Sequence, residues 1–188
     1  MAKQITLLLL SLTILAYGKG TIHLPRNQML YWSFPDENSV KFEYHCPMSL
    51  MEDDYDWVGI GFKDIMDGGD MRNADIVMIN LHDGRIDDYW SFMNSKPESD
   101  IKLGGLDSLA EKSVNAVDKY KMFSWSKPLN TGDKYDKMLA KNAKMNFIWA
   151  YGRINSQGNP KKHLDENKGS WEIVLSEDYT DEEEIFLI

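Results

Sequence analysis

Apolar and polar residues alternate with a period of two along much of the chain, which is the pattern of half-buried β-strands. The clearest case is VKFEYHC, residues 40–46, where one side carries Val, Phe, Tyr and Cys and the other carries Lys, Glu and His. Other segments predict strands as well: 29–34, 57–62, 74–81, 85–92, 120–126, 145–152 and 170–175. Turn sequences such as PDENS and HDG separate them. Short strands with frequent turns predict an antiparallel β-sandwich or barrel.

Two segments between these strands show a weaker pattern. Residues 93–118 predict one strand and loops, and residues 131–144, TGDKYDKMLAKNAK, predict a single helical stretch. The C-terminal residues, SEDYTDEEEIFLI, form an acidic run with an apolar tip. A run of this kind is usually solvated. The alternative is that it acts as a docking peptide.

The N-terminus has the features of a secretory signal peptide. A lysine precedes the apolar run ITLLLLSLTILAYG, and small residues precede a cleavage point after Gly18. The run is too short for a typical membrane-spanning helix. We therefore expect a signal peptide over 1–18, a lead-in over 19–27, one β-domain over 28–176 and an acidic tail over 177–188. The mature chain is expected to be secreted, without a membrane span.

The composition limits the classes of partner that this chain is expected to bind. It has 188 residues, 12% aromatic, with a net charge of -9. An acidic chain lacks the basic footprint that nucleic acids and anionic membranes require. Its one cysteine, Cys46, excludes an internal disulfide. Because Cys46 lies on the apolar side of 40–46, we expect a buried thiol, with an intermolecular bridge as the alternative.

Sequence motifs give little support for catalysis. There is no GxSxG, CxxC or HExxH motif, and the four histidines are scattered. The loop DIMDGGDMRNAD is rich in aspartate but lacks the spacing of a calcium-binding EF-hand loop. We expect a solvated acidic turn there, and calcium binding remains the alternative.

Methionine in that loop suggests another chemistry. Met66 and Met71 lie where a thioether gains little from packing, although methionine most often fills a core. A loop methionine and a distant histidine can hold haem iron for electron transfer. His163, in a polar loop before the last predicted strand, is the candidate partner, and a plain surface histidine is the alternative.

The order of five short motifs resembles the DOMON domain family. These are DWVGIGF, MRNADIV, DGRIDDYWS, FSWSKPLNTGDKYD and FIWAYG, and the resemblance covers about residues 28–176. It implies an immunoglobulin-like antiparallel β-sandwich. In haem-binding members it implies axial ligands at Met71 and His163, and in some members a structural cation near Asp75.

Two hypotheses of function follow from this resemblance. The sharper one is a b-type haem module for one-electron transfer, with Trp57, Phe62 and Trp149 as walls of the haem slot. The alternative is a haem-free module that binds carbohydrate or protein in an extracellular assembly. Because the resemblance includes no copper monooxygenase catalytic domain, we do not expect the chain to be an enzyme.

Overall fold

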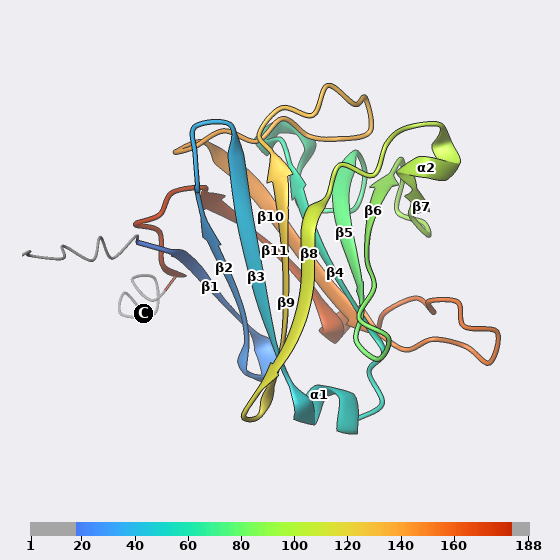
Figure 1. Cartoon of the computed structure of the whole chain (residues 1–188). Coiled ribbons are helices and arrows are strands. Elements are labelled where there is room, and N and C mark those ends of the chain that lie inside the picture. The colour runs from blue at the N-terminus through green and yellow to red at the C-terminus, as the bar shows by residue number, and fades with distance from the viewer. Residues whose placement is uncertain (1–17, 182–188) are drawn as a thin grey trace, which may run out of the picture.

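The structure is a computed structural model that describes residues 18–181, and these fold into two packed antiparallel sheets (Figure 1). One sheet has five strands in the order β1-β2-β3-β9-β8, and the other has six in the order β11-β10-β4-β5-β6-β7. The predicted all-β, immunoglobulin-like sandwich is confirmed. Among the described residues, no helix has the length and apolar character needed to cross a membrane.

The strands and helices have the following bounds. The five-stranded sheet consists of β1 (Gly20–Leu24), β2 (Gln28–Ser33), β3 (Ser39–Pro47), β9 (Tyr120–Pro128) and β8 (Ala110–Val117). The six-stranded sheet consists of β11 (Lys168–Val174), β10 (Lys144–Gly152), β4 (Trp57–Lys63), β5 (Ala74–Asn80), β6 (Ile86–Ser91) and β7 (Glu98–Ser99). Short helices are α1 (Met48–Glu52), α2 (Asp100–Leu103), η1 (Pro25–Asn27), η2 (Ile65–Asp67) and η3 (Asp165–Asn167).

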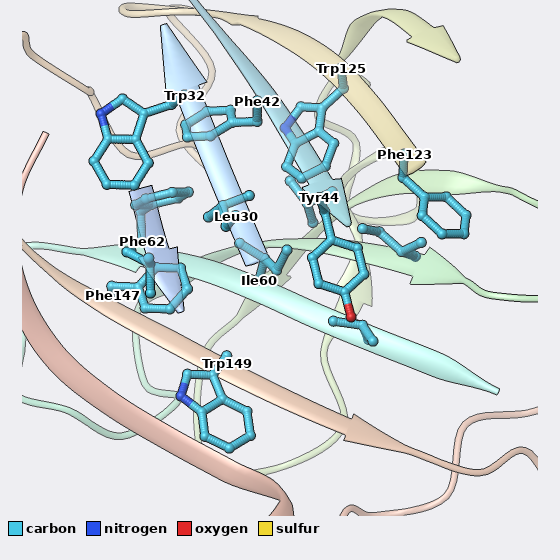
Figure 2. Packing of buried hydrophobic residues seen from close by; sticks show 14 of the residues in the cluster. Leu30, Trp32, Phe42, Tyr44, Ile60, Phe62, Phe123, Trp125, Phe147 and Trp149 are labelled. Carbon is cyan, nitrogen blue, oxygen red and sulfur yellow. The ribbon is translucent and has the colours of Figure 1, made fainter. Parts of the chain in front are cut away.

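Aromatic side chains from both sheets meet in the core (Figure 2). The ring centroids of Phe42 and Phe62, which come from different sheets, are 5.1 Å apart, and those of Phe42 and Trp125 are 5.5 Å apart. Each buried side chain of this size contributes about 1.5–3 kcal/mol through the hydrophobic effect. Cys46 is fully buried as predicted, and burial raises the pKa of its thiol to about 12.

The predicted helix over 131–144 is wrong, because this segment forms turns that also bond to the sandwich. The Lys137 amide donates to the Asp75 carboxylate at 3.0 Å, and the Asp136 carboxylate accepts from Lys127 at 2.5 Å. Gly132 has φ +71, a left-handed conformation that interrupts a helix. Long-range partners have therefore overridden the helical propensity of this segment.

Strand β1 was missed by the sequence analysis, which treated it as a lead-in. It pairs with β2 along its whole length. The first part of the acidic tail lies along its other edge, where the Thr21 amide donates to the Tyr179 carbonyl at 2.9 Å. At least up to Asp181, whose carboxylate accepts from the His23 amide at 2.8 Å, the tail is thus attached to the sandwich. The predicted signal peptide, apart from Gly18, and the apolar tip lie outside the described residues.

Candidate functional site

The candidate site is a pocket of about 470 Å³ on the outer face of the six-stranded sheet. In β4, Val58, Ile60 and Phe62 point into the core, so the alternate positions face outward. The floor of the pocket is apolar and includes Gly59, Ile76, Met78 and Ile148. Gly59 lies opposite Met78 in the sheet, and a Cβ on it would lie 3.3 Å from the Met78 sulfur.

Three loops and one edge strand surround this floor. The β4–β5 loop contributes Gly69–Met71, the β6–β7 loop contributes Asn94–Pro97, the β10–β11 loop contributes Pro160–His163, and β11 contributes Lys168–Ser170. The two predicted ligands, Met71 and His163, therefore line the same pocket although they come from loops far apart in the sequence.

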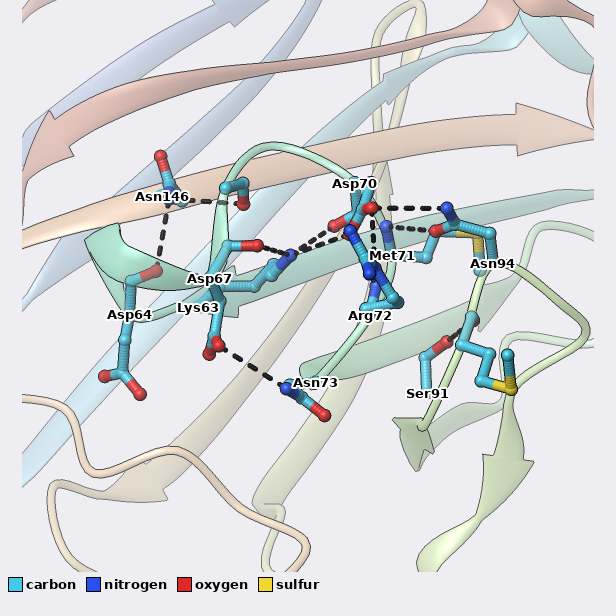
Figure 3. Close-up of polar contacts among 12 residues, drawn as sticks. Lys63, Asp64, Asp67, Asp70, Met71, Arg72, Asn73, Ser91, Asn94 and Asn146 are labelled. Carbon is cyan, nitrogen blue, oxygen red and sulfur yellow. Dashed lines mark hydrogen bonds and ion pairs between the residues drawn. The ribbon is translucent and has the colours of Figure 1, made fainter.

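The loop that carries Met71 is held by a buried lysine (Figure 3). Lys63, which is fully buried, donates from Nζ to the carbonyl oxygens of Asp67 at 3.0 Å and Asp70 at 2.6 Å. The amide of Met71 donates to the side chain of Asn94 at 3.1 Å, which joins two of the pocket loops. These bonds hold the backbone of the loop directly before Met71 and at the Met71 amide.

The carboxylates of the same loop are matched by cationic side chains of the protein. Asp70 accepts from Lys63 and Arg72, and Lys137 donates to Asp64 at 2.6 Å and to Asp67 at 2.9 Å. Burial acts to raise the pKa of Asp70, but hydrogen bonds from Arg72, Asn94 and Lys63 hold it well below its ordinary value. The loop is thus a network of ion pairs, and its geometry gives no support for calcium.

His163 is half-buried and has a defined hydrogen bond. Its Nδ1 lies 3.2 Å from the Leu164 carbonyl oxygen, which requires Nδ1 to carry the proton and leaves a lone pair on Nε2. Burial lowers its pKa, and the neighbouring Lys168 and Lys162 lower it further, against the effect of the Leu164 bond. The site therefore favours neutral imidazole, the form that binds a metal.

Two of the three predicted aromatic walls lie at the pocket. The Trp57 ring is 6.4 Å from that of His163, and its indole nitrogen donates to the Arg153 carbonyl at 3.0 Å. Trp149 stacks on Tyr151 in the core and also lines the pocket. The prediction for Phe62 is wrong, because the alternation of β4 turns its ring into the core against Phe42 and Phe147.

Asp75 lies on the other side of the sheet, in a buried cluster around Lys127. The Lys127 Nζ is 2.7 Å from Asp75, 3.4 Å from Asp88 and 2.5 Å from Asp136. These three carboxylates lie close enough together to hold a metal ion, but the ammonium already contacts all of them. The structural cation expected near Asp75 does not fit this arrangement, since a lysine supplies the opposing charge.

One further carboxylate, Asp100, is fully buried, and neither of its oxygens has a hydrogen-bond partner within residues 18–181. Burial and the nearby carboxylates of the Lys127 cluster raise its pKa to about 8. The same causes raise the pKa of Asp88 to about 7, although Lys127 opposes them. These two groups therefore hold protons that a solvated aspartate would release.

Sequence reasoning missed the lysines of both sites. Lys96, Lys161, Lys162 and Lys168 line the pocket, although the chain is acidic overall. The alternation of apolar and polar residues does not identify these lysines, because they lie in loops or at a strand end. Lys127 did carry a signal, since it follows Phe123 and Trp125 on the apolar side of β9. A lysine at such a position must find buried carboxylates.

Comparison with known proteins points to one family. The family model of the DOMON domain matches residues 26–152. The cytochrome b domain of pyranose dehydrogenase from Coprinopsis cinerea superposes with a TM-score of 0.53 at 12% identity, covering 86% of this chain and 83% of that one. The cytochrome domain of Myriococcum thermophilum cellobiose dehydrogenase gives 0.50 at 12% identity, covering 84% and 79%. No curated protein matches in sequence.

Proposed function

The chain belongs to the DOMON domain family, and from this premise we propose that it binds b-type haem in the pocket lined by Met71 and His163 and serves in one-electron transfer. The observation that carries the proposal is the shared pocket, which brings a thioether and an imidazole from two separate loops to one cavity. Its volume of about 470 Å³ is in the usual range for small-molecule and cofactor sites. The likeness in fold to cytochrome domains agrees with it.

The residues of the pocket suit the roles of axial ligands. The Leu164 carbonyl oxygen fixes the His163 tautomer through Nδ1, as hydrogen-bonded partners of ligating histidines usually do. Met71 is positioned by Asn94 and by the loop that Lys63 holds. Bound haem would supply an iron that takes up and releases single electrons, and a methionine ligand favours the reduced state.

The charge at the pocket fits the carboxylates of haem. Lys168 pairs with Asp165 at 2.8 Å, whereas no described carboxylate lies within ion-pair distance of Lys96, Lys161 or Lys162. An apolar floor beneath unpaired cationic side chains matches a flat apolar ring with two propionate groups. Charged residues of this kind would orient the ligand in the pocket.

Spectroscopy tests the proposal directly. Purified protein, or protein reconstituted with haemin, should show a Soret band that shifts on reduction, and Met71→Ala and His163→Ala should each change the ligation spectrum. The matched control is Met66→Ala, because Met66 belongs to the same loop but is 94% exposed and lies outside the pocket lining. Protein that takes up no haemin would refute haem binding and favour the haem-free carbohydrate- or protein-binding alternative. Altered spectra in the Met66 variant alone would refute the ligand assignment.

A further inference from the structure

A row of histidine and methionine side chains crosses the five-stranded sheet on the face opposite the core. In the strand register, His23 pairs with Met29, Met29 pairs with His45, and His45 pairs with Met122. Their chain neighbours Leu30, Tyr44 and Phe123 are fully buried in the core. Since successive side chains point to opposite faces of a sheet, the whole row lies on the outer face.

The register places two thioethers beside one imidazole. Directly opposed residues of antiparallel strands have Cβ atoms about 4.5–5.5 Å apart, so Met29 and Met122 flank His45 at that spacing. All three side chains are half-buried. A methionine side chain with three rotatable bonds can bring its sulfur over a neighbouring position on the sheet.

The hydrogen bond between His45 and Glu43 suits a metal site. The Nε2 of His45 lies 2.7 Å from a carboxylate oxygen of Glu43, which directs the proton to Nε2 and leaves the lone pair on Nδ1. Metal-binding histidines are usually paired with a carboxylate in this way. The Tyr31 hydroxyl donates to the Met29 sulfur at 3.1 Å, and the Tyr31 ring lies 4.8 Å from that of His45.

We propose that Met29, His45 and Met122 form a binding site for Cu(I). Thioether sulfur is a soft ligand that selects Cu(I) over calcium, magnesium and manganese, and imidazole also suits copper. Glu43 orients the imidazole, and His23 continues the row beyond Met29, where its Nδ1 lies 2.8 Å from Asp181. The site lies on the opposite face of the sandwich from the haem pocket and does not depend on haem binding.

Titration with Ag(I) alone tests the site, because this ion has the charge and ligand preferences of Cu(I) but no redox chemistry under these conditions. Protein labelled with ¹³C at the methionine methyl groups is followed by NMR. One equivalent of Ag(I) should shift the methyl signals of Met29 and Met122, while those of Met66 and Met138, which are 94% and 68% exposed, should stay in place. Absent shifts, or shifts of Met66, Met138 or the pocket residue Met71 instead, would overturn the proposal.

Competition for Cu(I) against a chromophoric chelator gives the affinity. Met29→Leu and Met122→Leu preserve side-chain volume and should each weaken binding, and the double variant should abolish it. Glu43→Gln should weaken binding about tenfold through loss of the oriented imidazole. Met66→Leu is the matched control and should bind as the unaltered protein does. Unchanged affinity in a double variant with a normal thermal melt would contradict the site.

Discussion

Lys127 and Asp75 join the two sheets of the sandwich through a buried ion pair, with the Nζ 2.8 and 2.7 Å from the two carboxylate oxygens. Lys127 comes from β9 and Asp75 from β5, and both are almost wholly buried. Asp88 and Asp136 share the same ammonium. Four ionisable groups are thus removed from water together, and their contacts with one another replace the contacts with water that burial removes.

Lys127→Met should lower the free energy of unfolding by about 3–5 kcal/mol, because it leaves buried carboxylates without their opposing charge. Denaturant-induced unfolding at neutral pH measures this change. Lys102→Met is the control, since Lys102 is 72% exposed and its ion pair with Glu98 lies in solvent. Equal losses in the two variants would show that the cluster contributes no more than a surface pair.

Removal of calcium by a chelator should leave the melting temperature unchanged. Lys127 occupies the position between Asp75, Asp88 and Asp136 that a cation would need, and Lys137 pairs with the loop carboxylates. Calorimetry of protein purified without a chelator, before and after treatment, checks this expectation. A lower melting temperature after chelation that calcium restores would contradict it.

The contribution of Asp100 to stability should fall as the pH rises from about 4 towards 8. In the folded state Asp100 has a pKa raised to about 8, whereas in the unfolded chain it is near 4. Between these values the unfolded state releases a proton that the folded state keeps, so rising pH favours unfolding. Asp88, with a pKa raised to about 7, acts in the same direction.

Asp100→Asn should weaken this pH dependence and raise the melting temperature at pH 8, because the amide cannot ionise. Thermal melts over the pH range of about 5–8 measure the slope. Asp178→Asn, at an exposed position, is the control and should leave the slope unaltered. An Asp100→Asn profile parallel to that of the unaltered protein would show that Asp100 does not retain its proton.

Gly152→Ala should disturb the pocket that we propose for haem, through Trp57. These residues lie opposite each other in β10 and β4, and a Cβ on Gly152 would lie 2.7 Å from the Trp57 ring. We expect a loss of stability of about 1–3 kcal/mol and weaker haemin binding. Trp57→Phe in the same chain should recover part of the stability, and additive losses in the double variant would contradict a direct clash.

Reversal of charge at the pocket should weaken haemin binding. Lys161→Glu/Lys162→Glu places negative charge where the haem carboxylates are expected, and the effect should diminish with added salt. Haemin titration at low and high ionic strength measures it. Lys41→Glu/Lys144→Glu, two exposed residues outside the pocket lining, matches the change in net charge. Equal weakening in both double variants would indicate a general effect of charge.

Much of the fold was predictable because alternation is a local property. Each of the eight predicted strands corresponds to a strand of the structure, with ends that differ by one or a few residues. The segment over 131–144 was not predictable in this way. Its conformation depends on Asp75 and Lys127, which are distant in sequence, and local propensity carries no information about them.

The sequence predicted the two candidate ligands of the site, but it did not predict all of the side chains around them. Met71 and His163 were selected from their loops and from the resemblance to a family, and the structure brings both to one pocket. Phe62 was misplaced because an apolar run such as β4 does not show which side faces the core. Packing of β4 against the five-stranded sheet decides this.

Residue alternation, turn chemistry and motif order are properties of neighbouring residues, so the amino-acid sequence was sufficient for the β-sandwich, its family and the position of the methionine loop. The pocket, the Lys127 cluster and the row through His45 arise from pairing between distant strands. Strand order and register depend on which pairing of all the strands together buries their apolar side chains in the core. For that reason these three features became visible only in the folded chain.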